Sequence, residues 1–184
     1  MTGIMAGALE GYCVHLIFPR RFCYYYEIMP KATGKSRFYA QGLRFSCTRC
    51  SSCCRYESGF VFLSARDVSA LKAALKLGQE DFMELYCRWV PNEDGKNRLS
   101  LKEKYNYDCV FWEKEGCRVY DARPLQCVTF PFWPSVLKDK DNWEMTARDC
   151  PGMNQGVNHS PGSIEKLLSD RRKEPIIEQL SSPL

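Results

Sequence analysis

Apolar positions recur at helical spacing in one stretch near the middle of the chain. The positions are Val68, Leu71 and Leu75. This spacing places them on one face of an amphipathic helix. Ser64 followed by Asp67 has the character of a capping box, with the shorter Asp in place of Glu, and Gly78 is a natural end. The pattern therefore predicts a helix between these residues.

A second helix is predicted from Glu80 to Trp89, where large apolar side chains share a face and Pro91 follows. The shared face consists of Phe82, Leu85, Tyr86 and Trp89. We expect the two helices to pack as an antiparallel pair over a small core. "PNEDGKN" is typical of a turn, and "RLSLKEKYNY" is expected to contain a short strand.

Shorter elements are predicted after these helices. "CVFW" and "CRVY" flank "EKEG", which indicates a β-hairpin with Gly116 in its tight turn. Asp121 is expected to cap a short helix through "ARPLQC", with Pro124 tolerated in the first turn. "TFPFWP" at 129–134 should be extended, because its prolines forbid a regular helix.

The last part of the chain alternates turns with periodic segments. "KDKDN" predicts a turn, "WEMTA" a strand and "CPG" a loop. From Ser163 to Leu180 the pattern is helical, with Ile164, Leu167 and Leu168 on one side and a break near Pro175.

Cysteine is the residue type that changes this picture. The chain has 184 residues and 11 cysteines, and an odd number argues against a complete disulfide framework. The opening residues lack the basic start and clean apolar run of a secretory signal, and no apolar run is long enough for a transmembrane helix. We therefore expect a cytoplasmic protein with reduced thiols and no membrane partner. The net charge of +4 is too small to predict a nucleic-acid partner.

Four cysteines fall within eight positions of the chain. They are Cys47, Cys50, Cys53 and Cys54. With two residues between cysteines the backbone can turn so that both sulfurs face one centre, as in zinc and iron–sulfur sites. Four more cysteines follow in turn-rich settings: Cys109, Cys117, Cys127 and Cys150. A metal bound by cysteines so far apart would couple binding to folding.

Together these motifs resemble the YkgJ-type cysteine-cluster family, a zinc- or iron-chelating domain named for its CxxCxxCC motif. The resemblance is carried by Phe45, Cys47, Cys50, Cys53, Cys54, Cys109, Cys117 to Tyr120, Arg123, Pro124, Cys127, Phe130 to Phe132, and Cys150. It implies that the eight cysteines belong to a chelated metal site, and it leaves the biological role unassigned.

The fold class expected from these patterns is α+β. We predict a small cysteine-rich, metal-stabilised domain of mainly short helices, a β-hairpin and long loops. Residues 43–152 would form the cysteine-cluster metal-binding domain. Residues 1–42 would be a poorly ordered N-terminal extension, with Met29 as an alternative start, and residues 153–184 a C-terminal helical tail.

Thiolate ligands select zinc or an iron–sulfur cluster over magnesium or calcium. The ferredoxin-like Cys47–Cys50–Cys53 loop and the Cys150–Pro151 step favour an iron–sulfur cluster, while structural zinc sites use the same pieces. Two four-thiolate centres, or one centre surrounded by further thiols, are both compatible with the count. The adjacent Cys53 and Cys54 are expected to point in different directions and so to join two sulfur sets.

Neighbouring side chains suggest how such a site is supported. Cations close to the cysteines would stabilise thiolates, although exposed arginines often do little. The candidates are Arg44, Arg49, Arg55, Arg118 and Arg123. The aromatics of "TFPFWP" would form an apolar wall beside the metal, or alternatively a patch for a protein partner. Cys87 is interpreted as a buried free thiol, and Cys13 and Cys23 are left unassigned.

Other functions compete with metal binding alone. A related cysteine cluster occurs in flagellin lysine N-methylase proteins, so one alternative is an accessory or minimal relative of such enzymes. A second is a thiol redox or metal-delivery protein, which needs an exposed cysteine of low pKa. A zinc-ribbon-like nucleic-acid module is disfavoured by the modest charge. His15 and His159 lack a supporting motif, and no catalytic residue is predicted.

Overall fold

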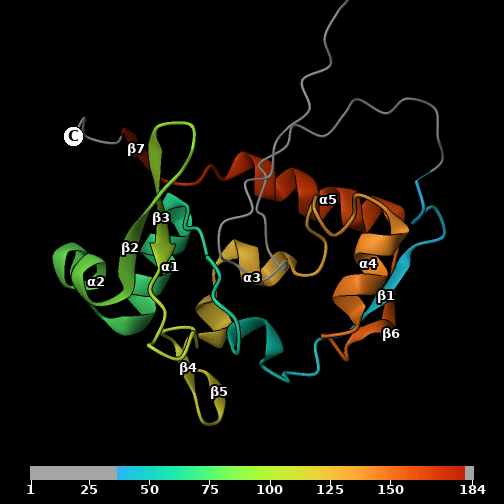
Figure 1. Cartoon of the computed structure of the whole chain (residues 1–184), viewed down its shortest axis with the longest axis horizontal. Helices are drawn as coiled ribbons and strands as arrows, with labels where there is room; N and C mark the ends of the chain where they lie inside the picture. Colours follow the sequence, from blue (N-terminus) through green and yellow to red (C-terminus); the bar gives the residue numbers. More distant parts are fainter. Residues whose placement is uncertain (1–36, 181–184) are drawn as a thin grey trace, which may run out of the picture.

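Short helices and small antiparallel sheets surround a central helix in the computed structural model, which describes residues 37–180 (Figure 1). The helices are α1 (Ala65–Leu75), α2 (Gln79–Tyr86), α3 (Leu125–Thr129), α4 (Lys140–Ala147) and α5 (Pro161–Lys173), with single 3₁₀ turns η1 (Ser52–Cys54) and η2 (Tyr120–Ala122). The strands are β1 (Leu43–Phe45), β2 (Cys87–Pro91), β3 (Lys96–Leu101), β4 (Trp112–Glu113), β5 (Gly116–Cys117), β6 (Met153–His159) and β7 (Glu178–Leu180). This mixture confirms the predicted α+β class.

The strands form three small sheets. β1 pairs with β6, the order β2-β3-β7 makes a three-stranded sheet, and β4 pairs with β5. Every strand pairing within these sheets is antiparallel. The β1–β6 pairing joins segments more than a hundred residues apart, so it fixes the start of the cysteine cluster against its last member.

Two hydrophobic cores lie on either side of α3. The first core consists of Leu63, Val68, Leu71, Phe82, Cys87, Leu99, Leu101, Phe111 and Val119. The second core consists of Tyr39, Phe132, Val136, Leu137, Trp143, Met153, Ile164 and Leu168. In Figure 1 the elements of the first core, coloured green, lie on one side of α3. Helix α4 and strands β1 and β6 lie on the other side, and α5 extends from one side to the other. The predicted boundaries at residues 42 and 153 stay a prediction, and residues 1–36 lie outside the described residues.

The capping box predicted at the start of α1 is confirmed. The Asp67 amide donates to Ser64 Oγ at 3.2 Å, and the Ser64 amide donates to Asp67 Oδ2 at 2.9 Å. The predicted end at Gly78 is wrong. Lys76 adopts a left-handed conformation at φ 55°, its amide bonds back to carbonyls of the last turn, and Gly78 instead precedes α2 as its N-cap.

The second predicted helix is too long. It ends at Tyr86, and Cys87–Pro91 form strand β2, which pairs Cys87 with Leu101 and Trp89 with Leu99 across β3. The apolar spacing up to Trp89 suits a helix. Pairing with β3 along the whole segment makes it a strand instead. Cys87 is buried on this strand, and burial raises its pKa to about 11, which confirms the interpretation as a buried free thiol.

The predicted hairpin is confirmed, with β4 and β5 joined by a tight turn and Gly116 at φ 120°. The predicted cap at Asp121 is wrong. Asp121 lies within η2, and Pro124 occupies the N-cap of α3 instead. The chain leaves α3 at Thr129 and turns through a cis peptide bond between Phe130 and Pro131, so the "TFPFWP" segment contains no continuing helix.

Residues 140–147 form helix α4, whereas the sequence pattern predicts a turn followed by a strand. Asp139 caps this helix by accepting a hydrogen bond from the Asn142 amide at 2.8 Å. Trp143 is buried on its inner face. The predicted C-terminal helix is confirmed as α5, which ends at Lys173, and the residues after Pro175 form β7 rather than more helix.

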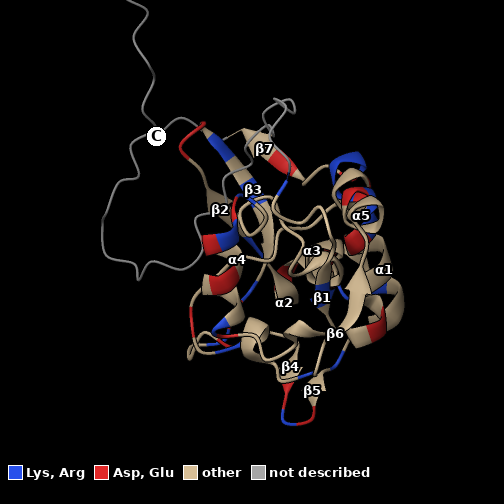
Figure 2. Cartoon of the chain, turned by 90° about the vertical axis from the view of Figure 1, so that its right-hand side faces the viewer, with Lys and Arg blue, Asp and Glu red and all other residues tan. Residues whose placement is uncertain are grey.

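The described residues, 37–180, bear on whether the chain crosses a membrane and on how its surface charges are distributed. No helix in this range has the length and apolar composition needed to cross a membrane. Positive and negative side chains are interspersed along α5 and around the β4–β5 hairpin (Figure 2). The absence of a nucleic-acid partner and the cytoplasmic location stay predictions.

Two buried polar side chains hold α3 in place. Asp67, which caps α1, accepts a hydrogen bond from the Leu125 amide at 2.8 Å through Oδ1. Gln126 accepts from the Phe62 amide at 3.0 Å and donates to the Phe60 carbonyl at 2.7 Å. Residues 125 and 126 are therefore anchored directly before Cys127.

Replacing Gln126 with alanine should destabilise the protein. Gln126→Ala removes the side-chain partners of the Phe62 amide and the Phe60 carbonyl, and the loss should be about 2–4 kcal/mol. Urea unfolding followed by circular dichroism measures it. Gln79 is exposed and bonded to Lys72, so Gln79→Ala is the matched control and should change stability by less than about 0.5 kcal/mol. Equal losses in the two variants would contradict this account of α3.

Candidate metal centre

The β1–β6 pair brings the two ends of the cysteine constellation together. Phe45 pairs with Met153, and the Ser46 amide donates to the Gly152 carbonyl at 3.1 Å. Cys47 and Cys150 therefore leave the same end of this small sheet. A Cβ atom added to Gly152 would lie 2.3 Å from the Ser46 carbonyl oxygen, so the approach depends on the missing side chain.

His159 also belongs to this support. Its Nε2 lies 3.0 Å from the Phe45 carbonyl oxygen, and its ring packs against Phe45 and Phe132. These contacts hold β1 beside β6, so His159 supports the structure here.

The loop that carries the first four cysteines is compact because two of its residues are left-handed. Arg49 has φ 57° and Ser51 has φ 66°, after which η1 presents Cys53 and Cys54. The Arg49 amide donates to Cys47 Sγ at 3.4 Å, the kind of backbone contact that stabilises a thiolate. Alternation of left-handed and ordinary residues thus folds four sulfurs into one short loop.

Cys109 is tied to Cys54 through the backbone and through a neighbouring ion pair. The Cys109 amide donates to the Cys54 carbonyl at 2.7 Å. The next residue after Cys54 is Arg55, whose Nε donates at 3.2 Å to the buried Asp108 carboxylate, directly before Cys109. The Arg55 guanidinium also lies 3.6 Å from the Trp112 ring centroid. These contacts join two cysteines that are 55 positions apart in the sequence.

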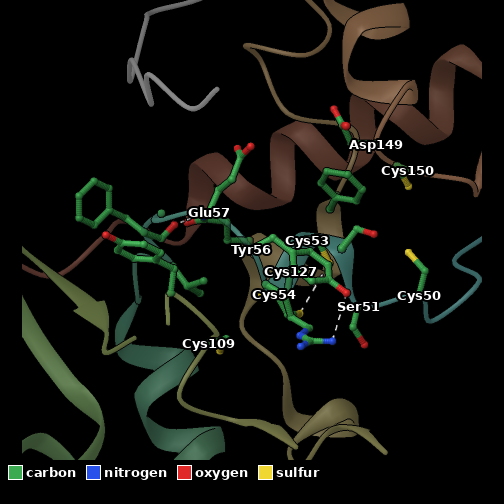
Figure 3. Close-up of a pocket in the computed structure, with 18 of the residues that line it drawn as sticks. Cys50, Ser51, Cys53, Cys54, Tyr56, Glu57, Cys109, Cys127, Asp149 and Cys150 are labelled. Carbon is green, nitrogen blue, oxygen red and sulfur yellow. Dashed lines mark hydrogen bonds between the residues drawn. The ribbon is translucent and has the colours of Figure 1, made fainter. Parts of the chain in front are cut away.

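A cavity of about 280 Å³ lies where these segments meet. Seven of the eight predicted cysteines line it: Cys47, Cys50, Cys53, Cys54, Cys109, Cys127 and Cys150. Figure 3 shows Cys53, Cys54 and Cys127 in its middle, with Cys50 and Cys150 together on one side and Cys109 on the other. Cys117 does not line the cavity. Phe130 and Trp133 do, as expected for an apolar wall.

The sulfurs of Cys53 and Cys54 converge. The two Sγ atoms are 3.7 Å apart and share a hydrogen bond. The expectation that these adjacent side chains point in different directions is therefore wrong. The short 3₁₀ turn η1 places consecutive side chains closer in direction than an extended segment would.

The hydrogen bond between Cys53 and Cys54 separates their acidities. The hydrogen bond with Cys54 lowers the pKa of Cys53 to about 7 despite burial, with help from the positive charge of Arg123. The same bond, with burial and nearby thiols, raises the pKa of Cys54. Of the two, Cys53 is the sulfur that becomes a thiolate first.

Among the remaining thiols, burial raises the pKa of four, whereas the pKa of Cys50 is lowered. Burial is the largest cause that raises the pKa of Cys109 to about 11, and it also raises the pKa of Cys117, Cys127 and Cys150. At Cys50 burial also opposes ionisation, but hydrogen bonds with Ser52 and Thr48 outweigh it and lower the pKa. A metal ion that binds the buried sulfurs has to displace their protons.

The five arginines near the cysteines have different tasks. Arg123 stacks 4.0 Å from the Tyr120 ring centroid, and its charge helps to lower the pKa of Cys53. At Cys117 the same charge acts in this direction, but burial outweighs it and the pKa is raised. The others make the contacts Arg44 to the Gly156 carbonyl, Arg49 to the Tyr120 ring, Arg55 to Asp108, and Arg118 to the Tyr86 hydroxyl. Arg123 therefore matches the predicted thiolate-stabilising role.

Thiols are suitable ligands for a soft metal ion. The sulfurs of the described cysteines are not yet close enough together to bind one ion. In residues 37–180, no three His, Cys, Asp or Glu side chains stand close enough together to hold a metal ion. Seven thiols nevertheless surround one cavity, and four of them belong to a single loop. Metal binding often organises ligands that are not yet in place, so the ligand roles of these cysteines stay a prediction.

Sequence patterns did not identify several residues that position the cysteines. They are Asp67, Asp108, Gln126 and Gly152. Asp108, Gln126 and Gly152 stand within two residues of a predicted ligand, which is a usable signal. The capping-box pattern identified Asp67 as a helix cap, but not its tertiary contact with the Leu125 amide.

The fold and site define a small α+β protein whose thiol-rich cavity lies between two cores. The family model CxxCxxCC, described as "Putative zinc- or iron-chelating domain", matches residues 46–151, which is more than half of the chain. The chain belongs to this family, and the resemblance seen in the sequence is confirmed.

Two curated relatives come from Methanocaldococcus jannaschii. Uncharacterized protein MJ0661 is 26% identical over 137 residues, covering 71% of this chain and 69% of the relative. Uncharacterized protein MJ0939 is 26% identical over 147 residues, covering 74% of this chain and 49% of the relative. No solved structure matches the chain.

Proposed function

We propose that this chain chelates zinc or iron through cysteine thiolates in the cavity between its two cores. The observation that carries the proposal is the convergence on one cavity of seven cysteines from four separate segments. The proposed ligands come from the eight predicted cysteines, and the bound metal would join the first core to the second. Soft sulfur ligands favour zinc and iron over magnesium and calcium.

The distance between Cys53 and Cys54 bears on the choice of metal. Two thiolates on one tetrahedral zinc ion, with bonds of about 2.3 Å, are about 3.8 Å apart. The observed Sγ–Sγ distance is 3.7 Å. In a [4Fe–4S] cube each iron takes a single thiolate, so adjacent ligands stand further apart, whereas each iron of a [2Fe–2S] cluster takes two. The distance therefore fits two thiolates on one tetrahedral zinc or iron ion better than a [4Fe–4S] cube, and the iron–sulfur cluster stays a prediction from the sequence.

Metal delivery is the second candidate function. Cys47 and Cys50 are exposed, and hydrogen bonds with Ser52 and Thr48 lower the pKa of Cys50. An exposed thiolate can exchange a metal with an acceptor, as this function requires. The methylase-related alternative rests on the sequence resemblance alone.

Metal analysis of the anaerobically purified full-length protein tests the proposal. We expect tightly bound zinc or iron, measured together with acid-labile sulfide and the visible absorption spectrum. Cys54→Ser should hold clearly less metal than the wild type. Cys87→Ala is the control, and it should keep the metal while costing about 1–3 kcal/mol as an ordinary core truncation. A wild-type protein that folds without tightly bound metal and with every thiol free would overturn the proposal.

A further inference from the structure

Seven cysteines line the cavity, and this number suggests that it holds more than one metal ion. A four-coordinate thiolate site uses four sulfurs. Seven cysteines line the cavity, which is three more than one such site needs and one fewer than two separate sites need. One shared sulfur makes seven cysteines sufficient for two tetrahedral ions.

Three of these cysteines gather at the end of the β1–β6 sheet. The Phe45–Met153 pair and the bond from Ser46 to Gly152 direct Cys47 and Cys150 from the same edge. Cys50 follows Cys47 around the left-handed turn and lies beside Cys150 in Figure 3. All three line the cavity, and Cys150 packs against the second core.

Three others gather on the side of the first core and α3. The hydrogen bond from the Cys109 amide to the Cys54 carbonyl holds these two residues together. Cys127 follows Gln126, whose side chain bonds the backbone at Phe60 and Phe62. Cys54, Cys109 and Cys127 all line the cavity.

Cys53 lies between the two groups. Its sulfur is 3.7 Å from that of Cys54 in one group. In Figure 3 it lies between Cys54 and the side of the cavity that holds Cys50 and Cys150. Figure 3 places it in the middle of the cavity.

We propose that the cavity holds two metal ions bridged by the Cys53 thiolate. One ion is bound by Cys47, Cys50, Cys150 and Cys53, and the other by Cys53, Cys54, Cys109 and Cys127. This inference rests on the proposed function and adds the number of ions and the assignment of their ligands. Cys117, which does not line the cavity, is then a neighbour of the site and not a ligand.

The surrounding charges suit such a centre. Seven thiolates and two divalent ions sum to a charge of about −3. Cationic groups stand beside both the shared sulfur and the first-core group. Arg123 acts on Cys53, and Lys104 acts on Cys109. Arg55 follows Cys54 and is fixed by Asp108 and Trp112. These cations offset the negative charge, as a buried thiolate cluster requires.

Native mass spectrometry of the full-length protein loaded with Zn²⁺ tests the number of ions. The wild type should hold two ions per chain. Cys150→Ser and Cys127→Ser should each hold one, whereas Cys117→Ser should still hold two. One ion per chain in the wild type, or a loss of one ion in Cys117→Ser, would overturn the inference. Complete absence of metal would instead overturn the proposed function itself.

Cadmium NMR tests the shared sulfur without depending on any variant. After loading with ¹¹³Cd²⁺, the wild type should give two cadmium resonances, both correlated with the β protons of Cys53. Two resonances with no common cysteine would disprove the bridge while leaving two-ion binding intact. A purified protein with stoichiometric iron and acid-labile sulfide would replace the two-ion centre with a cluster and leave metal chelation standing.

Discussion

Removal of the metal with a chelator is expected to destabilise the whole chain. The cavity lies between the first and second cores, and its cysteines come from both sides. Binding to the folded state alone contributes about 4 kcal/mol when free metal exceeds its dissociation constant a thousandfold. Urea unfolding with and without chelator measures the difference. The metal-free protein should unfold at a clearly lower urea concentration.

Two controls show whether this loss is specific. Zinc added back to the chelated protein should restore the midpoint, and magnesium should not, because thiolates are soft ligands. Cys87→Ala should show the same metal dependence as the wild type, since Cys87 is buried in the first core and is absent from the cavity lining. Identical midpoints with and without metal would contradict a metal that joins the cores.

Local signals in the sequence predicted much of the secondary structure. The capping box at Ser64 and Asp67 and the hairpin turn at Gly116 depend on neighbouring residues, so they could be recognised without the fold. The segment Cys87–Pro91 could not. Its apolar spacing fits a helix, and its strand conformation depends on β3, which follows it in the chain. Helix α4 carried a readable cap at Asp139, but the turn-forming composition around it favoured the wrong interpretation.

In the candidate site, too, some features follow from local sequence and others only from the folded structure. Cysteine spacing identified eight candidate ligands, and the structure brings seven of them to one cavity. Which sulfurs approach one another depends on backbone geometry that spacing does not specify. The positive φ angles of Arg49 and Ser51 shape the loop, and η1 turns Cys53 toward Cys54. The ligand roles of the eight cysteines stay predictions until metal analysis tests them.

Gly152→Ala is expected to destabilise the protein and to weaken its metal site. The new Cβ would lie 2.3 Å from the backbone carbonyl oxygen of Ser46, and neither backbone can move without opening the β1–β6 pair. Overpacking of this kind costs about 1–3 kcal/mol or more. Because Ser46 precedes Cys47 and Gly152 follows Cys150 closely, the variant should also lose metal affinity. Thermal unfolding and metal content of the same preparation measure both effects.

A second glycine in the same part of the chain separates this effect from the general cost of adding a side chain. Gly162 lies in the first turn of α5, where the nearest atom to an added Cβ is Ser160 Oγ at 3.9 Å. Gly162→Ala should leave metal content unchanged and stabilise the helix by up to about 1 kcal/mol. If Gly152→Ala lowers thermal stability but keeps full metal content, the β1–β6 contact supports the fold without positioning Cys47 against Cys150. If it behaves like Gly162→Ala in both measurements, the close approach at Ser46 is not a constraint on the protein.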